Sequence, residues 1–235
     1  MKRLLFLTVV LVVDSTGADA KLPPLSPRAE AAIQRVRPGL EVELEKQGLA
    51  WGSAVFIRVF KESRKLEVWV WNQDRYLLFK TYPVCYFSGD LGPKLREGDL
   101  QAPEGFYRVT ADLMNPWSRF HLSFNLGYPN RFDRAKGRTG GLIMVHGNCV
   151  STGCFAMTDP VIEEIYALVD ASLRKGEKSV PVHVFPFRLE QPRLEKEKDH
   201  RWIGFWRNLK EGYDYFETHQ KPPAVSVLNG RYAFN

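Results

Sequence analysis

Cysteine is scarce in this chain of 235 residues, which contains Cys85, Cys149 and Cys154 and no other cysteine. An odd number leaves one thiol unpaired in an oxidising compartment, or pairs it with another chain. The spacing lacks the Cys-x-x-Cys pattern of thioredoxin-like redox motifs, and with His146 it matches no common zinc-ligand pattern. We therefore predict no metal site and no cofactor, and the leftover thiol is the first indication of cysteine chemistry.

Long apolar runs are also lacking, except at the N-terminus. The basic pair Lys2-Arg3 precedes a run over residues 4–13 that is apolar except for Thr8, and the small-residue pattern Ala18-Asp-Ala20 follows it. A run of this length is too short for a membrane-spanning helix, which needs about 20 residues. We predict a signal peptide over residues 1–20, cleavage before Lys21, and no membrane span after cleavage.

No internal repeat, low-complexity tract or nucleic-acid-binding motif is present. The net charge of +6 suits an anionic partner, but it does not choose between nucleic acid, membrane headgroups and a carboxylate-rich polymer. With 44% hydrophobic and 13% aromatic residues, the chain can bury a substantial core. Without a recognisable binding motif, we predict no nucleic-acid partner.

The apolar periodicity predicts a mainly β fold with flanking helices, of the α+β class. Ser26 and Pro27 are typical of a helix start, and Pro38-Gly39 should end that helix. Asp159 and Pro160 should begin another helix after the cysteines. The predicted strands are 54–60, 66–71, 76–84, 105–110, 119–124, 141–146 and 179–187, the predicted helices are 27–36, one beginning at 159, and 201–217, and the predicted loops are 88–104 and 125–140.

Chemistry concentrates in the segment from His146 to Met157, His-Gly-Asn-Cys-Val-Ser-Thr-Gly-Cys-Phe-Ala-Met. A thiol needs a nearby base or a lowered pKa to become a nucleophile, and histidine is the usual base. Histidine ends a predicted strand here, and Cys154 lies a few residues before a predicted helix. Glycines at 147 and 153 would let the backbone turn tightly, and amides near the second cysteine could face an oxyanion. An inert core cysteine, a metal site and a redox dithiol are the alternatives.

This segment resembles the His-Gly…Ser-x-Gly-Cys signature of YkuD-type L,D-transpeptidase domains, and most closely their YafK-like branch. The upstream run Ala102–Val109, Ala-Pro-Glu-Gly-Phe-Tyr-Arg-Val, resembles a second family motif, and Gly127–Asn130 and Leu209–Asp214 resemble the branch. The resemblance implies a β-sandwich catalytic domain over 50–187. Around it lie an N-terminal linker and helix (21–49) and a C-terminal aromatic helix and tail (188–235).

The resemblance also implies roles for individual residues. It makes Cys154 the nucleophile that attacks at diaminopimelate of a peptidoglycan stem through a thioester, and His146 its base. Turn or oxyanion support falls to Gly147, Ser151, Thr152 and Gly153. Many members carry an arginine two residues after the nucleophile, where this chain has Ala156.

Several other residues are candidates for the site. Stem-peptide carboxylates could bind the basic side chains of the predicted loop 125–140, and His121 could line the cleft. A disulfide between Cys85 and Cys149 would leave Cys154 free, although the sequence alone does not fix the pairing. The basic candidates are Arg131, Arg134 and Arg138.

The branch includes enzymes that hydrolyse the link between diaminopimelate and the lysine of an anchored outer-membrane lipoprotein. We therefore expect a periplasmic hydrolase whose partners are peptidoglycan stem peptides and such a lipoprotein. The alternatives are an L,D-transpeptidase that forms cross-links or attaches amines, and a non-catalytic peptidoglycan-binding module. The two enzymatic interpretations differ in the acceptor of the acyl group, which is water for the hydrolase and an amine for the transpeptidase. Both acceptors are compatible with the sequence.

Overall fold

The computed structural model describes residues 21–235, and the predicted signal peptide lies outside the described residues. Within that range, no helix has the length and apolarity needed to cross a membrane. The helices are α1 (Pro27–Lys46), η1 (Ala111–Leu113), α2 (Arg131–Ala135), α3 (Asp159–Arg174), α4 (Gln191–Glu195) and α5 (Ile203–His219). The strands are β1 (Val55–Phe60), β2 (Lys65–Asn72), β3 (Arg75–Pro83), β4 (Gly105–Val109), β5 (Met114–Asn115), β6 (Ser123–Asn125), β7 (Met144–His146), β8 (Phe155–Ala156), β9 (Val180–Phe185), β10 (Val225–Leu228) and β11 (Arg231–Phe234).

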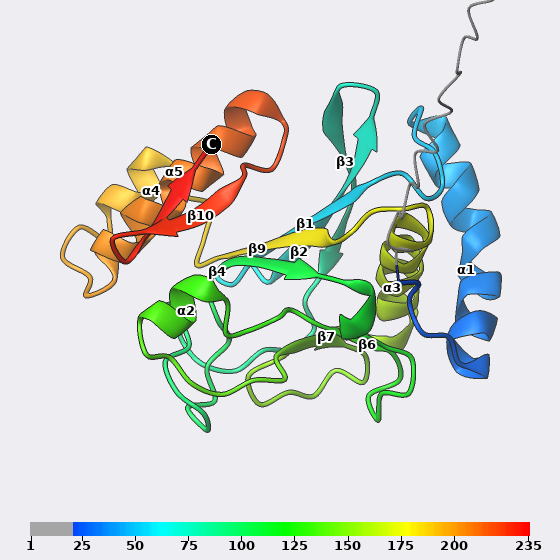
Figure 1. Cartoon of the computed structure of the whole chain (residues 1–235), viewed down its shortest axis with the longest axis horizontal. Coiled ribbons are helices and arrows are strands. Elements are labelled where there is room, and N and C mark those ends of the chain that lie inside the picture. The colour runs from blue at the N-terminus through cyan, green and yellow to red at the C-terminus, as the bar shows by residue number, and fades with distance from the viewer. Residues whose placement is uncertain (1–20) are drawn as a thin grey trace, which may run out of the picture.

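A five-stranded sheet with the order β3-β2-β1-β9-β4 lies at the centre of the molecule (Figure 1). The predicted meander of the first three strands is confirmed, since β1 pairs antiparallel with β2 and β2 with β3. Strand β9 returns from α3 and pairs parallel with β1 and antiparallel with β4. The mixed sheets and flanking helices confirm the predicted α+β class.

A smaller sheet, β5-β6-β7-β8, packs against one side of this core and carries the cysteine segment. Val145 of β7 and Phe155 of the edge strand β8 are fully buried in the same apolar cluster as Ile57 and Val59 of β1. The helix that follows, α3, lies in that cluster too, through Ile162 and its neighbours. The core therefore fixes the backbone on both sides of the cysteine turn.

The first helix is longer than the sequence predicts. Ser26 Oγ accepts a hydrogen bond from the amide of Ala29, which confirms the predicted start, but Pro38 lies inside a helix that continues to Lys46. A proline in a helix interior removes one hydrogen bond and costs about 3 kcal/mol. Leu40 and Leu44, both after the proline, are buried in the core, and this burial holds the second half of the helix in place.

The C-terminal segment covers the other face of the large sheet. Phe60 and Phe185 of that face join Trp206, Leu209 and Tyr213 of α5 in a second apolar cluster. The predicted aromatic stripe of this helix is confirmed as packing. The predicted tail is a hairpin, β10–β11, and α4 precedes the helix.

Three of the sequence predictions, for a loop, a strand and a helix cap, need correction. The predicted loop 125–140 contains α2, which Asn130 and Asp133 begin with a reciprocal capping box. The predicted strand 119–124 is reduced to β6, because residues 119–122 form a turn in which His121 has a positive φ of 67°. Thr158, rather than Asp159, is the N-cap of α3.

Candidate active site

The short sheet brings Cys154 and His146 to one face. Strand β8 runs parallel to β7 with His146 opposite Ala156, and the backbone amide of Met144 donates to Cys154 Sγ at 3.3 Å. Side chains two positions apart on a strand point to the same side, and opposed residues share that side. Cys154 directly precedes β8 and bonds Met144, two residues before His146, so the thiol lies at the end of the face that carries His146.

Two hydrogen bonds with the hydroxyl group of Ser151 hold the backbone of Cys154 in place. Ser151 Oγ accepts from the amide of Cys154 at 2.8 Å and donates to its carbonyl oxygen at 2.8 Å. Between them Gly153 has a φ of 118°, where a side chain would be strained. Thr152 is exposed at the tip of the turn. The serine and the glycine thus have distinct backbone roles in this turn.

The thiol of Cys154 is half-buried and is bonded to the backbone. Its Sγ donates to the carbonyl oxygen of Leu142 at 3.5 Å, in addition to accepting from Met144. Burial raises the pKa of the thiol above its usual 9.0, and the Met144 amide, Ser151 and the charge of Lys94 oppose that rise. The resting cysteine is therefore a protonated thiol at neutral pH, which needs a base.

The imidazole of His146 is held in the tautomer that a base requires. Its Nδ1 lies 2.6 Å from the carbonyl oxygen of Gly147, and since a carbonyl only accepts, Nδ1 carries the proton and Nε2 has the lone pair. The ring of Phe120 packs on the imidazole with 4.6 Å between centroids. Burial lowers the pKa of His146 below 6.5, against the effect of the Gly147 hydrogen bond. The ring is consequently neutral at pH 7.

The turn after His146 depends on Gly147. Its amide donates to the carbonyl oxygens of Phe120 and Leu122 at 3.0 and 3.2 Å, so it supports the turn and is not free to bind an oxyanion. A Cβ at this position would lie 2.5 Å from Asp159 Oδ1, which itself accepts from the amide of Asn148 at 2.7 Å. The amide of Cys154 is likewise taken, by Ser151 Oγ at 2.8 Å.

A disulfide joins Cys85 to Cys149, with 5.4 Å between their Cα atoms, and Cys154 stays free. The bond ties the end of β3 to the loop between His146 and Cys154. Next to it, the amides of Cys85 and Tyr86 both donate to the carbonyl oxygen of Ala156. The loop is thus anchored on both sides of the thiol.

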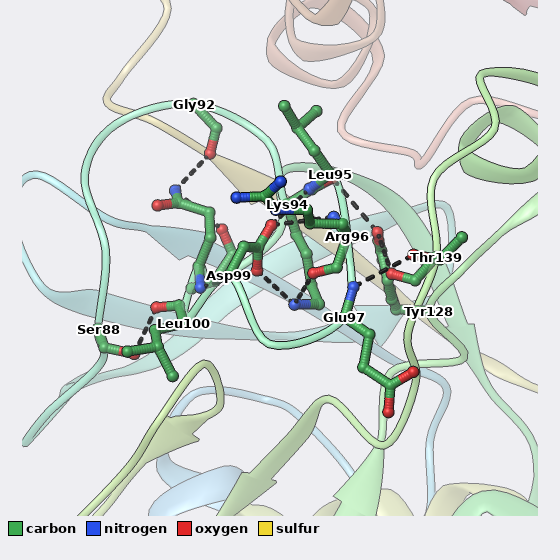
Figure 2. A network of polar contacts seen from close by, with 12 residues as sticks. Ser88, Gly92, Lys94, Leu95, Arg96, Glu97, Asp99, Leu100, Tyr128 and Thr139 are labelled. Carbon is green, nitrogen blue, oxygen red and sulfur yellow. Dashed lines mark hydrogen bonds and ion pairs between the residues drawn. The ribbon is translucent and has the colours of Figure 1, made fainter.

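The loop between β3 and β4 forms a wall beside the nucleophile turn. The carboxylate of Asp99 accepts from Lys94 Nζ at 2.5 Å and from the amides of Leu95, Arg96 and Gln101 (Figure 2). Burial works against ionisation, yet the Lys94 ion pair and these amides hold the pKa of Asp99 below its usual value. The Gln101 carbonyl oxygen lies 3.7 Å from the position of a Cβ at Gly153. The sequence predicted this segment as a loop but gave no sign of its place beside the thiol.

The other predicted substrate residues make their hydrogen bonds to groups other than the thiol, and their binding roles stay predictions. His121 Nε2 lies 2.7 Å from Glu163 Oε1, so this histidine is bonded to α3. Arg138 is buried and bonds Asp133 Oδ1 at 2.7 Å, and its predicted part in binding stem-peptide carboxylates stays a prediction. Arg131 and Arg134 line a hollow with β4 and β10 that includes no residue of the 142–154 segment.

Sequence reasoning missed the residues that act through the backbone. Met144 and Leu142 bond the thiol only with main-chain atoms, so their side chains carry no signal. Asp159 was assigned to helix capping, although its carboxylate bonds the turn after the histidine. Within residues 21–235, no three His, Cys, Asp or Glu side chains lie close enough together to hold a metal ion.

The model of the YkuD-type L,D-transpeptidase catalytic domain matches residues 54–184. The chain belongs to this family. It is 47% identical over 181 residues to YafK of Escherichia coli (strain K12), whose name places it provisionally among the L,D-transpeptidases. That match covers 77% of this chain and 74% of the relative. Family members act on peptidoglycan, which implies a location outside the cytoplasmic membrane.

Two solved structures have a related fold. The helical cell shape determining protein Pgp2 from Campylobacter jejuni aligns with a TM-score of 0.45 and 17% identity, over 81% of this chain and 80% of that one. Bd1075 from Bdellovibrio bacteriovorus aligns with a TM-score of 0.41 and 20% identity, over 75% and 78%. At these TM-scores, neither likeness bears on the substrate or partners of this chain.

Proposed function

We propose that this protein is an exported cysteine hydrolase that cuts the amide between peptidoglycan diaminopimelate and the lysine of an attached lipoprotein. The observation that carries the proposal is the bond of Cys154 Sγ to the amide of Met144, two residues before His146, with the histidine in the Nδ1–H tautomer. A neutral imidazole with a free Nε2 is suited to take a proton from a thiol that burial keeps protonated.

The reaction proceeds in two steps, formation of the thioester and its hydrolysis. His146 Nε2 takes the thiol proton, Cys154 Sγ attacks the diaminopimelate carbonyl, and the C–N bond breaks as the imidazolium returns its proton to the leaving amine. A water then loses a proton to the same nitrogen and attacks the thioester, which releases a carboxylate and the thiol. The thiol bonds Leu142 and Met144 at rest, so rotation about its Cα–Cβ bond precedes the first proton transfer.

The oxyanion of each tetrahedral intermediate needs hydrogen-bond donors that are not already in use. The amides of Gly147 and Cys154 are taken by other acceptors. The Gly153 amide, in the left-handed turn directly before the nucleophile, is the donor we assign to this role. Thr152, exposed at the same tip, supplies the next amide along the chain.

Hydrolysis rather than amine transfer is supported by the environment of Ala156. This residue stands where many family members carry an arginine, and it is fully buried in β8. An alanine here offers no bidentate partner to hold the carboxylate of an incoming stem peptide. Water needs no such partner, so it has an advantage over an amine acceptor at this thioester.

The test uses purified sacculi that carry covalently attached lipoprotein, incubated with the chain from residue 21 or with its Cys154→Ala variant. Mass spectrometry should find lipoprotein released by the wild type alone, with a free carboxyl on diaminopimelate. New cross-links or attached amines without release would replace the proposal with transpeptidation. Equal results for the two proteins would instead favour a binding module.

A further inference from the structure

A deep hollow of about 640 Å³ lies between α2, the start of α5 and the β10–β11 turn. Its walls come from two parts of the chain that the family model treats differently, since α2 belongs to the matched domain and α5 and the hairpin follow it. We call it the basic hollow, after the four cations that line it. These are Lys136, Arg138, Arg201 and Arg231.

The charge of the basic hollow is not balanced within its walls. Arg138 pairs with Asp133 at 2.7 Å, and Arg231 pairs with Glu211 at 2.8 Å. Among residues from 21 onward, Lys136 and Arg201 have no carboxylate within 4.0 Å, and no Asp or Glu lines the hollow. Two exposed cations beside one concave surface form a site for an anion.

Aromatic rings form the floor beneath these cations. Phe132 stacks on Phe205 with 5.6 Å between centroids, and Lys136 Nζ lies 5.7 Å from the Phe132 centroid. Arg201 lies over the ring of Trp202 at 5.2 Å. A concave, largely apolar floor with a few convergent charges is typical of a site for an organic ligand rather than a simple ion.

The hollow leads toward the nucleophile along the β3–β4 loop. Leu95, Arg201 and Trp202 line both the basic hollow and a second hollow of about 300 Å³ that also contains Asp99 and Gln101. Gln101 in turn lies against Gly153, as described above. A polymer bound in the basic hollow can therefore follow the loop to the thiol.

We propose that the basic hollow is a second binding site for the peptidoglycan polymer, and that it holds a carboxylate-bearing stem peptide while another is cut at Cys154. This inference rests on the proposed function for its ligand. Stem-peptide carboxylates match Lys136 and Arg201, and the apolar faces of a glycopeptide match Trp202 and Phe205.

Gly204 provides a test that spares the fold. It lines the hollow, lies in α5 without a positive φ, and a Cβ there meets nothing within 4 Å. Gly204→Glu therefore adds a carboxylate to the hollow, and in the first turn of α5 the helix dipole favours a carboxylate. Gly39, in α1, also lacks a positive φ and has open space around it, so Gly39→Glu is a matched control for charge and helix effects.

Both substitutions are made in the Cys154→Ala background, and the fraction bound to purified sacculi is measured by co-sedimentation over a range of salt concentrations. We expect Gly204→Glu to weaken binding about tenfold, roughly 1.4 kcal/mol, and Gly39→Glu to leave it unchanged. Lys136→Ala with Arg201→Ala should weaken binding similarly. Lys46→Ala with Arg75→Ala, two exposed cations elsewhere, should not.

Three outcomes would overturn the inference. One is equal binding by Gly204→Glu and Gly39→Glu, and another is unchanged binding to sacculi whose stem peptides have been removed. The third is binding of the parent protein to anionic lipid vesicles that Gly204→Glu abolishes, which would assign the hollow to a membrane surface. Because the inactive background is used throughout, these results are independent of whether the wild type releases lipoprotein.

Discussion

Different polar groups stabilise the turn that carries Cys154 and the C-terminal segment that packs on the large sheet, which we call the C-terminal layer. Around Cys154 the hydrogen bonds come from main-chain atoms and one hydroxyl, that of Ser151. Beneath α5 they come from charged side chains, because the fully buried Lys61 and Glu104 pair at 3.1 Å and Trp206 Nε1 donates to the same carboxylate at 2.8 Å. The turn should therefore tolerate side-chain changes without unfolding, while the layer should not.

Removal of the proposed base is the largest expected effect at the turn. His146→Gln should lower the rate of lipoprotein release about 1000-fold, since it removes the nitrogen that we propose takes the thiol proton. The circular dichroism spectrum and unfolding midpoint should stay close to wild type. The matched control is His121→Gln, whose side chain bonds Glu163 on α3, and a comparable loss there would place that histidine in the mechanism instead.

The layer is best tested through Glu104. Glu104→Ala leaves the fully buried Lys61 ammonium without a counter-charge, and we expect a loss of about 3–5 kcal/mol in the free energy of unfolding. Glu62→Ala, which removes an exposed partner of Arg193, should cost less than about 1 kcal/mol in the same urea titration. Equal losses would show that the buried pair does not hold the layer.

Ser151 tests whether the turn acts through its backbone geometry. Ser151→Ala removes both hydrogen bonds to the Cys154 main chain, and a misplaced nucleophile should lower kcat about tenfold, roughly 1.4 kcal/mol. Thr152→Ala, at the exposed tip, is the control. It should change kcat less than about twofold, which corresponds to a few tenths of a kcal/mol. A loss of stability without a loss of kcat would assign Ser151 to folding alone.

The sequence predicts the parts of the fold that depend on side-chain periodicity. The β1–β3 meander and the buried stripe of α5 follow from apolar spacing, and the motif locates Cys154 beside a histidine. What it misses depends on long-range packing. The core keeps α1 helical past Pro38, and Asp133 turns a predicted loop into α2 and removes Arg138 from the solvent. Main-chain partners of the thiol have no sequence signature at all.

The activity should depend on pH in the direction set by the pKa values of His146 and Cys154. Burial lowers the pKa of His146 below 6.5, so the neutral base predominates at pH 7, and the acid limb of kcat/KM should have its midpoint below 6.5. Burial also raises the pKa of the Cys154 thiol above 9.0, so no second rise should occur before that pH. An acid midpoint at or above 6.5 would contradict a buried neutral base.

The free energy of unfolding should also depend on pH through the protonation of His146. Because the folded pKa of His146 lies below the unfolded value of 6.5, the unfolded chain binds more protons, and the free energy of unfolding should fall as pH drops from 7 to 5. His183, which burial drives to a pKa well below 6.5, contributes in the same direction. In His146→Gln the fall should therefore be smaller but not absent, and urea titrations at pH 7 and 5 measure the difference. If the wild type and variant lost equal stability, the imidazole would have to be solvated in the folded protein, and its Nε2 would lose the desolvated setting that makes it a neutral base at the thiol.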